Sequence, residues 1–201
     1  MTDHYFTAQP ASADERRRLS VRLAGRPVSI EVAPGVFSPR GLDKGTAILL
    51  DEVPAPPPTG CFLDLGCGWG PIALTLALRS PAARIWAVDV NERALDLVRR
   101  NAELLGLAAV TASTPEREVA ALTFDLIWSN PPIRVGKDTL HTLLRTWLPR
   151  LAPGGTAYLV VAKNLGSDSL QRWIETDLRM PCDRHATSKG FRVLAVSGPR
   201  P

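Results

Sequence analysis

Residues 129–132, Ser-Asn-Pro-Pro, follow an apolar run, FDLIW, and combine a carboxamide with two rigid residues. Proline cannot donate to a sheet ladder and disfavours helix in the residue before it, so Asn130-Pro131-Pro132 is predicted to form a stiff, extended loop. The Asn130 side-chain oxygen and the Pro131 carbonyl could accept hydrogen bonds from the two hydrogens of a planar NH₂ group, such as that of a base or an amide. Such an amine is a poor nucleophile because its lone pair is delocalised. Two acceptors would localise that pair and aim the nitrogen at an activated methyl carbon, a reaction that depends on positioning rather than on a strong base.

A second constellation, DLGCGWG at residues 64–70, follows an apolar run and opens a predicted helix. Its three glycines let backbone N–H groups approach a ligand closely, as in small polar cofactor sites. Nicotinamide, flavin and S-adenosylmethionine (SAM) sites share this feature, and some such turns only close a tight corner. Cys67 is interpreted as a small filler rather than a nucleophile, because nothing nearby would hold it as a thiolate.

Asp89 is the acidic residue at the end of the next apolar run, RIWAVDV. A carboxylate there can accept both hydrogen bonds from a ribose diol, which favours a cofactor that carries a nucleoside. The alternative is that Asp89 caps the helix NERALDLV, a role that Asn91 also suits, and the two roles are compatible. Ser113 and Thr114, after the following strand, are candidate adenine contacts.

From Cys61 onward short β-rich runs alternate with helical ones, which is typical of a parallel sheet covered on both faces by helices. Five strands are predicted at CFLDLGC, RIWAVDV, AAVTAS, FDLIWS and TAYLVVA. The helices between them are PIALTLALRS, NERALDLVRRNAELLG, a weaker PEREVAAL, and KDTLHTLLRTWLPRLAPGG, which Gly154-Gly155 closes. A further helix, SDSLQRWIETDL, precedes the strands CDRHATS and FRVLAVS, whose tight joint at Lys189-Gly190 would make the last strand antiparallel. The predicted fold class is therefore α/β, with a Rossmann-like, mostly parallel sheet of seven strands.

The predicted organisation divides the chain into three parts. Residues 1–17 are polar and are interpreted as a flexible arm. Residues 18–55 hold a small N-terminal β-hairpin appendage, because LSVRLAGRPVSIEVAPGVFS alternates apolar and polar residues, and a short helix in GLDKGTAILLDEV. Residues 56–201 form the main domain after the rigid spacer PAPPPTG.

Length and composition limit the class of protein. A chain of 201 residues suits one α/β domain with an appendage. No apolar run approaches the roughly 18 residues that cross a bilayer, and the first residues lack the apolar core of a signal peptide. Three cysteines without a CxxC pair argue against a disulfide framework and a zinc site. A cytoplasmic protein without metal or membrane attachment is predicted, and 24 Lys plus Arg against 20 Asp plus Glu lean modestly toward polyanions.

With DLGCGWG, Asp89 and NPP in that order, the chain resembles a class I SAM-dependent methyltransferase, similar to the amino methyltransferases that carry Asn/Asp-Pro-Pro. It is similar in particular to the small methyltransferase domain family, which includes the small-subunit (16S) ribosomal RNA guanine-N2 methyltransferase C and single-domain archaeal relatives. The resembling segments are VAPGVFSPRGLDKGTAILL, DLGCGWGPIAL, SNPPIRVGK, LAPGG and TSKGFRVL.

The resemblance implies that residues 56–201 are a SAM-dependent methyltransferase domain. The cofactor-binding residues it implies are Phe37, Ser38, Asp64, Gly66, Cys67, Gly68, Gly70, Asp89, Val90 and Asn130. The catalytic residues it implies are Asn130, Pro131, Pro132 and Ile133. Many relatives have Tyr or Phe in place of Ile133, so stacking on a flipped base must be weaker or come from elsewhere, for which Phe37 and Trp69 are candidates.

Basic residues near these motifs are candidate contacts for phosphates that flank an extruded nucleotide. Arg134, Lys137 and His141 follow the catalytic loop, although a solvated helix face is the alternative and is favoured for His141. Lys163, Lys189 and Arg192 lie at the predicted ends of late strands, where an α/β sheet opens its ligand crevice. Trp128, Trp147 and Trp173 sit in apolar patterns and are predicted to be core.

The expected function is methyl transfer from SAM to an exocyclic amine of RNA, with guanine N2 of 16S rRNA as the leading acceptor. A protein glutamine amide is the first alternative, against which Ile133 and the basic surface weigh. A catalytically idle RNA-binding module of the same fold is the second, and the intact SNPP loop weighs against it. A nicotinamide dehydrogenase would have no purpose for that loop. The expected partner is RNA, free or in an assembling small subunit, and the protein is expected to be a monomer or weak homodimer.

Overall fold

The computed structural model of the protein describes residues 15–116 and 118–200. The predicted flexible arm, residues 1–17, lies outside this part of the chain except for its last three residues. Arg17 already belongs to the first strand, β1 (Arg17–Leu23).

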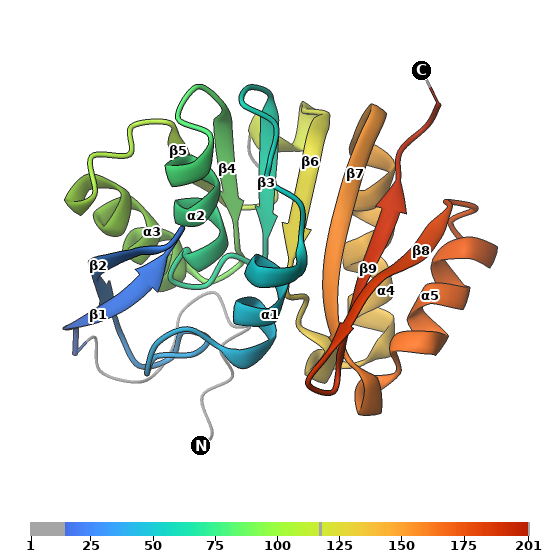
Figure 1. Ribbon diagram of the computed structural model, residues 1–201, viewed down its shortest axis with the longest axis horizontal. Coiled ribbons are helices and arrows are strands. Elements are labelled where there is room, and N and C mark those ends of the chain that lie inside the picture. Colours follow the sequence, from blue (N-terminus) through green and yellow to red (C-terminus); the bar gives the residue numbers. More distant parts are fainter. Residues whose placement is uncertain (1–14, 117, 201) are drawn as a thin grey trace.

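Seven strands form one sheet in the order β5-β4-β3-β6-β7-β9-β8 (Figure 1). Their bounds are β3 (Cys61–Leu65), β4 (Arg84–Val88), β5 (Val110–Ser113), β6 (Phe124–Ser129), β7 (Leu151–Ala162), β8 (Cys182–Ser188) and β9 (Phe191–Ser197). Strands β3 to β7 are parallel, and β9 runs antiparallel to both of its neighbours, β7 and β8. The predicted seven-stranded, mostly parallel sheet with an antiparallel last strand is therefore confirmed.

Helices cover both faces of this sheet, as predicted (Figure 1). The α-helices are α1 (Lys44–Glu52), α2 (Pro71–Arg79), α3 (Glu92–Leu104), α4 (Lys137–Trp147) and α5 (Ser167–Thr176). Successive strand residues point to opposite faces, so Phe62 packs with α1, α2 and α3 while Leu63 and Leu65 pack with α4 and α5. Trp128, Trp147 and Trp173 are core residues, as predicted, with exposed fractions of 0%, 1% and 9%.

Two predicted helices are shorter than expected. The helix predicted through LAPGG ends at Trp147, and a single 3₁₀ turn, η3 (Leu148–Arg150), leads into β7. Leu151 pairs with Phe124 and Thr156 pairs with Leu126, so the glycines of LAPGG form a bulge in β7 rather than a helix end. Among the described residues of PEREVAAL, Glu118–Ala121 form the 3₁₀ turn η1 rather than an α-helix.

The predicted N-terminal hairpin consists of β1 and β2 (Arg26–Val32). Its turn residues, Ala24 and Gly25, both have positive φ, at 48° and 76°, which suits a two-residue hairpin connection. Its apolar face packs in one cluster with residues of α2 and α3 and with Trp69, which is 1% exposed. The hairpin thus shares a core with the main domain, and Trp69 is too deeply buried to stack on a substrate.

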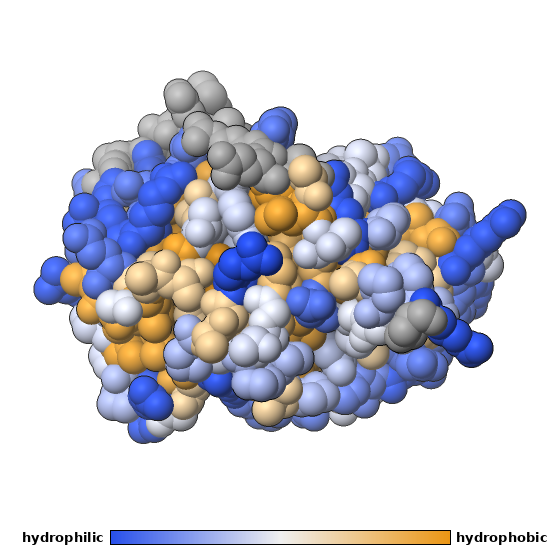
Figure 2. All heavy atoms as spheres, turned by 90° about the horizontal axis from the view of Figure 1, so that it is seen from above, coloured by the Kyte–Doolittle hydropathy of each residue, from blue (hydrophilic) through white to orange (hydrophobic). Residues whose placement is uncertain are grey.

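The described residues were compared with the requirements of a membrane-spanning helix and of a metal site. None of the helices in the described part of the chain has the length and apolar character that a membrane crossing requires. Residues 15–116 and 118–200 also contain no cluster of three or more His, Cys, Asp or Glu side chains that could hold a metal ion. Figure 2 looks onto the end of the molecule where the parallel strands begin, and there several separate apolar areas lie among hydrophilic residues.

Candidate active site

A cavity of about 900 Å³ opens at the carboxyl ends of the parallel strands. The chain runs from β3 outward to β4 and β5 and then returns to the other side of β3 as β6, so β3 and β6 flank a topological switch point. Ligand crevices of open α/β sheets form at such points. The cavity lies near the upper end of the range for small-molecule sites, about 300–1,000 Å³. It therefore has room for a cofactor and for part of a second molecule.

The glycine turn forms one wall of this cavity, and its backbone amides are already engaged. Gly66 and Cys67 donate to the Val88 carbonyl at 2.8 and 3.0 Å, and Gly68 donates to the Asp89 carboxylate at 3.0 Å. Gly66 and Gly68 have φ of 77° and 54° and line the cavity without side chains. The N–H groups of Gly66, Cys67 and Gly68 are thus directed at protein acceptors, while the missing side chains of the two glycines allow a ligand to approach the backbone closely.

Gly70, the third glycine of the turn, lies outside the cavity lining. A Cβ added there would lie 3.1 Å from Val98 Cγ2 of α3, so this glycine allows close packing between the turn and α3. The third glycine of dinucleotide-binding turns has a similar role, since it allows a helix and a strand to pack closely.

Asp89 lies at the end of β4 and lines the cavity, where it is half-buried. Its Oδ1 accepts the Asn91 amide at 2.9 Å and its Oδ2 accepts the Gly68 amide at 3.0 Å. Burial raises the pKa of Asp89, and these two amide donors oppose the rise. The N-cap of α3 is Asn91, whose side chain accepts the Arg93 and Ala94 amides. Asp89 is therefore not needed as a cap, and each oxygen keeps capacity for a further donor.

Asp64 is fully buried beneath the glycine turn and does not line the cavity. Its Oδ2 accepts the Ala73 amide at 2.9 Å in the first turn of α2, whose N-cap residue, Gly70, has no side chain to do so. Oδ1 has no hydrogen-bond partner, and burial raises the pKa of Asp64 to about 8. The residue thus holds the turn in place from below.

Two further predicted cofactor residues, Ser38 and Cys67, line a small second cavity. Its lining shares five residues with that of the first: Phe37, Asp43, Gly66, Gly68 and Asn130. Ser38 has φ of 52° and donates its hydroxyl to the Gly41 carbonyl at 2.7 Å. Burial raises the pKa of the Cys67 thiol, consistent with a filler rather than a nucleophile. Val90 lines neither cavity.

The SNPP loop is held by hydrogen bonds to β3 and within its own backbone. The Ser129 hydroxyl donates to the Leu65 carbonyl at 2.7 Å and ties the end of β6 to the end of β3. Pro132 has φ −75° and ψ 72°, and the Ile133 amide donates to the Pro131 carbonyl at 2.8 Å, which together make an inverse γ-turn. One lone pair of the Pro131 carbonyl remains for a ligand.

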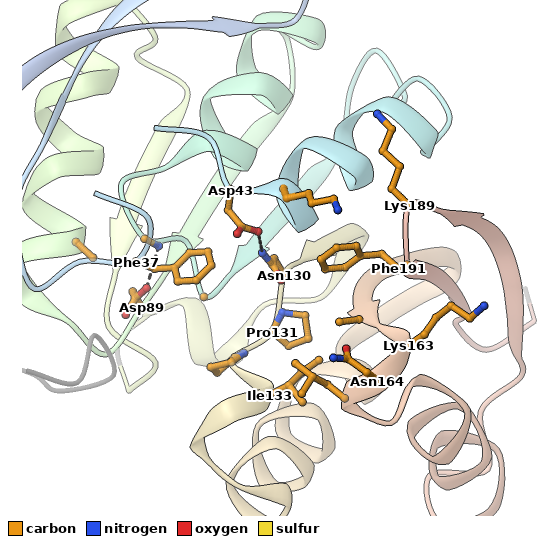
Figure 3. Close-up of a pocket in the computed structure, with 18 residues that line it drawn as sticks. Phe37, Asp43, Asp89, Asn130, Pro131, Ile133, Lys163, Asn164, Lys189 and Phe191 are labelled. Carbon is orange, nitrogen blue, oxygen red and sulfur yellow. Dashed lines mark hydrogen bonds between the residues drawn. The ribbon is translucent and has the colours of Figure 1, made fainter. Parts of the chain in front are cut away.

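The Asn130 side chain of this loop points toward Asp43, at the start of α1 (Figure 3). Its Nδ2 donates to Asp43 Oδ2 at 2.9 Å and to Thr46 Oγ1 at 3.0 Å. No described residue donates to Asn130 Oδ1. Asn130 and Pro131 both line the cavity, and the carboxamide oxygen of Asn130 is an acceptor that no described residue uses.

The far side of the cavity is basic and aromatic, and sequence reasoning found only part of it. Lys44, Lys163, Lys189 and Phe191 line this side, and Lys44 Nζ lies 5.9 Å from the centre of the Phe191 ring. The three lysines make no ion pair with a described residue. Lys163 and Lys189 were predicted here, but Lys44 and Phe191 were not. The motif TSKGFRVL contained the missing signal, an aromatic residue directly after a strand-joining turn.

Four other basic candidates behave differently. Arg192 pairs with Asp168 and does not line the cavity. His141 stacks on Trp173, with ring centres 3.8 Å apart, so it belongs to the α4–α5 contact. Lys137 is exposed outside the cavity lining, and the side chain of Arg134 lies outside the described residues.

The predicted adenine contacts lie outside the cavity as well. Ser113 is 5% exposed and donates its hydroxyl to the Thr114 carbonyl at 3.0 Å. Neither residue lines the cavity. Asp43 and Asn164, which the sequence did not single out, do line it.

Solved structures share this fold. A 16S rRNA N2 methyltransferase of T. thermophilus, in complex with AdoMet and guanosine, superposes with a TM-score of 0.75 at 23% identity, over 94% of this chain and 52% of that one. A methyltransferase of Pyrococcus furiosus gives a TM-score of 0.63 at 20% identity, over 84% of this chain and 88% of that one. At these identities the likeness shows the fold alone.

Relatives with higher sequence identity show the family of the chain. The chain is 34% identical to the uncharacterized protein YbxB of Bacillus subtilis (strain 168), over 84% of this chain and 86% of the relative. It is 33% identical to the ribosomal RNA small subunit methyltransferase C of Pseudomonas entomophila (strain L48), over 97% of this chain, and spans 58% of that relative's length. The family model of the methyltransferase small domain matches residues 27–195. The chain therefore belongs to the methyltransferase small domain family.

Proposed function

We propose that the protein transfers a methyl group from SAM to an exocyclic amine of RNA, with guanine N2 of 16S rRNA as the leading acceptor. The observation that carries this proposal is that Asn130 and Pro131, each with acceptor capacity that no described residue uses, line one cavity with Asp89 and the glycine turn. The names of the ribosomal RNA methyltransferase relatives support the RNA acceptor.

The residues of the turn fit SAM. Asp89 can accept from the ribose hydroxyls, because a carboxylate has about four acceptor positions and the backbone amides do not use all of them. Gly66 and Gly68 leave space for the cofactor against the backbone. Phe37 lies close to this part of the turn, with its Cβ 3.7 Å from where a Cβ of Gly68 would be. When bound, SAM supplies a methyl group on a positively charged sulfur. Asp64 and Gly70 act indirectly in this proposal, by holding the turn and packing it against α3.

The acceptor loop would hold the target amine. The two N–H groups of the amine would donate to Asn130 Oδ1 and to the remaining lone pair of the Pro131 carbonyl. This arrangement draws the nitrogen lone pair out of conjugation and directs it toward the methyl carbon. Holding two reactants in line supplies on the order of 7–11 kcal/mol of a barrier, so positioning is the main contribution of these residues.

The basic and aromatic side of the cavity supports a nucleotide rather than a peptide amide. Ile133 is aliphatic, and the aromatic residues that line the cavity are Phe37 and Phe191 (Figure 3). Phe37 lies beside Gly68 of the glycine turn, whereas Phe191 lies on the basic side, so we assign the stacking on a flipped base to Phe191. Lys44, Lys163 and Lys189 surround that side and can contact the phosphates next to the base. A peptide glutamine would use neither feature.

A methyl-transfer assay tests the proposal. The protein and labelled SAM would be incubated in three separate reactions. One would contain protein-free 16S rRNA, one small ribosomal subunits, and one a mixture of ribosomal proteins and release factors. The proposal predicts label in RNA. Label confined to protein would support the glutamine alternative, and binding of RNA without transfer would support the idle module.

A further inference from the structure

The first turn of α1 contacts the side chain of Asn130 although the two lie far apart in the sequence. Asp43, the N-cap of α1, uses one oxygen, Oδ2, to accept the amides of Gly45 and Thr46 at 2.8 and 3.2 Å and Asn130 Nδ2 at 2.9 Å. Thr46 Oγ1 accepts the second amide hydrogen of Asn130 at 3.0 Å. Thr46 is 2% exposed, so its hydroxyl has little access to water.

We infer that Asp43 and Thr46 are positioning residues that set the orientation of the Asn130 carboxamide, an inference whose catalytic consequence rests on the proposed function. An ionised carboxylate only accepts hydrogen bonds, so the Asp43 oxygen can face only the NH₂ side of the carboxamide. The Oδ1 side must then turn away from α1. This pair of residues is called the α1 clasp below.

The α1 clasp also limits what Asn130 can recognise. Both hydrogens of its amide are engaged by Asp43 and Thr46, so the carboxamide has only its oxygen for a substrate. An oxygen can accept from an amine but cannot donate to a carbonyl or to a ring nitrogen. The clasp therefore selects a target that donates hydrogen bonds, such as an exocyclic amine.

The start of α1 packs closely against Asn130. A Cβ added at Gly45 would lie 3.0 Å from Asp43 Oδ2, 3.1 Å from Phe191 Cε1 and 3.3 Å from Asn130 Nδ2. The helix that carries the clasp is fixed by Ile48 and Leu49, which are buried against the sheet. A turned carboxamide would also bring its oxygen against the Asp43 oxygen, with no hydrogen between them.

Matched variants test the inference through kinetics. Thr46→Val removes the hydroxyl and keeps the shape, and we expect kcat to fall about 2- to 10-fold, as for a neutral hydrogen bond, whereas Thr46→Ser should stay near the original rate. Asp43→Ser keeps a helix-capping oxygen that is too short to reach Asn130, and kcat should fall about 10- to 100-fold, as for a hydrogen bond to a charge. The Kd for SAM should change less than about twofold in all three, which a general loss of structure would not allow.

A second measurement does not depend on activity. The side-chain NH₂ signals of Asn130, assigned by their loss in Asn130→Ala, should exchange slowly with water and should exchange faster in Thr46→Val and Asp43→Ser. Thr75→Val, the same change at another buried helix position, serves as the control and should leave them unchanged. Faster exchange in the clasp variants, even if no RNA is methylated, would support the clasp while the proposed function fails. Unchanged exchange in both variants would overturn the inference.

Discussion

Individual polar residues of the candidate site use part of their hydrogen-bonding capacity within the protein and leave the rest for a ligand in the cavity. Asp89 holds the amides of Gly68 and Asn91 and keeps acceptor capacity on both oxygens. Asn130 uses its NH₂ group within the protein and leaves its oxygen for a ligand. The protein-facing bonds orient the groups before any ligand arrives, which is the preorganisation that transfer by positioning requires.

Asp89→Ala tests the cofactor half of the site. The substitution removes the carboxylate that would accept from the ribose hydroxyls, and we expect the affinity for SAM to fall about 10- to 100-fold, as for hydrogen bonds to a charged group. Calorimetric titration with SAM measures this change. A Kd equal to that of the original protein would leave Asp89 only a support for the glycine turn.

Phe191→Leu tests the acceptor half. Base stacking on an aromatic ring contributes about 1–3 kcal/mol, so the KM for RNA should rise about 5- to 160-fold. The Kd for SAM should stay unchanged, because Phe191 lies on the other side of the cavity. Phe191→Tyr keeps the ring and is the matched control. Equal KM values for the leucine and tyrosine variants would show that the base does not stack there.

Asp64 predicts a dependence of stability on pH. Its pKa is raised to about 8 by burial, above the ordinary value of about 3.9 that the unfolded chain has, so the folded state holds one more proton between these pH values. The resulting stabilisation is complete below about pH 4 and is lost as pH rises through about 8, at no more than about 1.4 kcal/mol per pH unit.

Urea unfolding of the SAM-free protein between pH 5 and about 8 measures this effect. Asp64→Asn keeps an oxygen for the Ala73 amide and has no titrating proton, so its free energy of unfolding should fall less steeply with pH. Asp51→Asn, at an exposed position on α1, is the control and should keep the original slope. Parallel slopes for Asp64→Asn and the original protein would contradict the assignment.

At the scale of elements, the hairpin β1–β2 and helix α1 complete a site that the sheet begins. Leu23, Ile30 and Val32 of the hairpin are at most 1% exposed and pack with α2 and α3, the helices that follow the glycine turn and Asp89. Helix α1 brings Asp43 and Lys44 to the cavity. The N-terminal segment is thus both a structural layer and a source of site residues.

Ile30→Ala tests whether the hairpin belongs to the core. Removing a fully buried isoleucine leaves a cavity, and we expect the free energy of unfolding to fall by about 2–5 kcal/mol in urea titrations. Val28→Ala, in the same strand but only half-buried, should cost less. A cost below about 1 kcal/mol for Ile30→Ala would indicate a loosely attached appendage.

Sequence patterns predict most of these elements because their signals are local. Alternation identified the strands of the hairpin, apolar runs identified the buried strands, and Asn130-Pro131-Pro132 marked the stiff loop. LAPGG was misassigned because Gly-Gly after a helical pattern resembles a helix end, and only pairing with Phe124 and Leu126 reveals the bulge. Asp43 was recognisable as a helix start, but its contact with Asn130 joins positions 87 residues apart and depends on the tertiary fold.

At the scale of the whole molecule, one cavity joins two halves with different chemistry. The ends of β3 and β4 provide the glycine turn and Asp89, whereas the end of β7 and the start of β9 provide lysines and Phe191. The SNPP loop, at the end of β6, lies between them because β6 is next to β3 in the sheet. A donor in the first half and an acceptor in the second would meet at Asn130 and Pro131.

The chemical identity of the methylated product is the decisive test of the proposed role of Asn130 and Pro131. RNA treated with the original protein and SAM would be digested to nucleosides and analysed by mass spectrometry, beside RNA treated with Asn130→Ala. The account predicts methyl on an exocyclic amine, N2-methylguanosine first, and a loss of about 100- to 1,000-fold in rate with Asn130→Ala while the Kd for SAM stays nearly the same. Methyl on a ribose oxygen or a ring carbon, or an unchanged rate with Asn130→Ala, would contradict it.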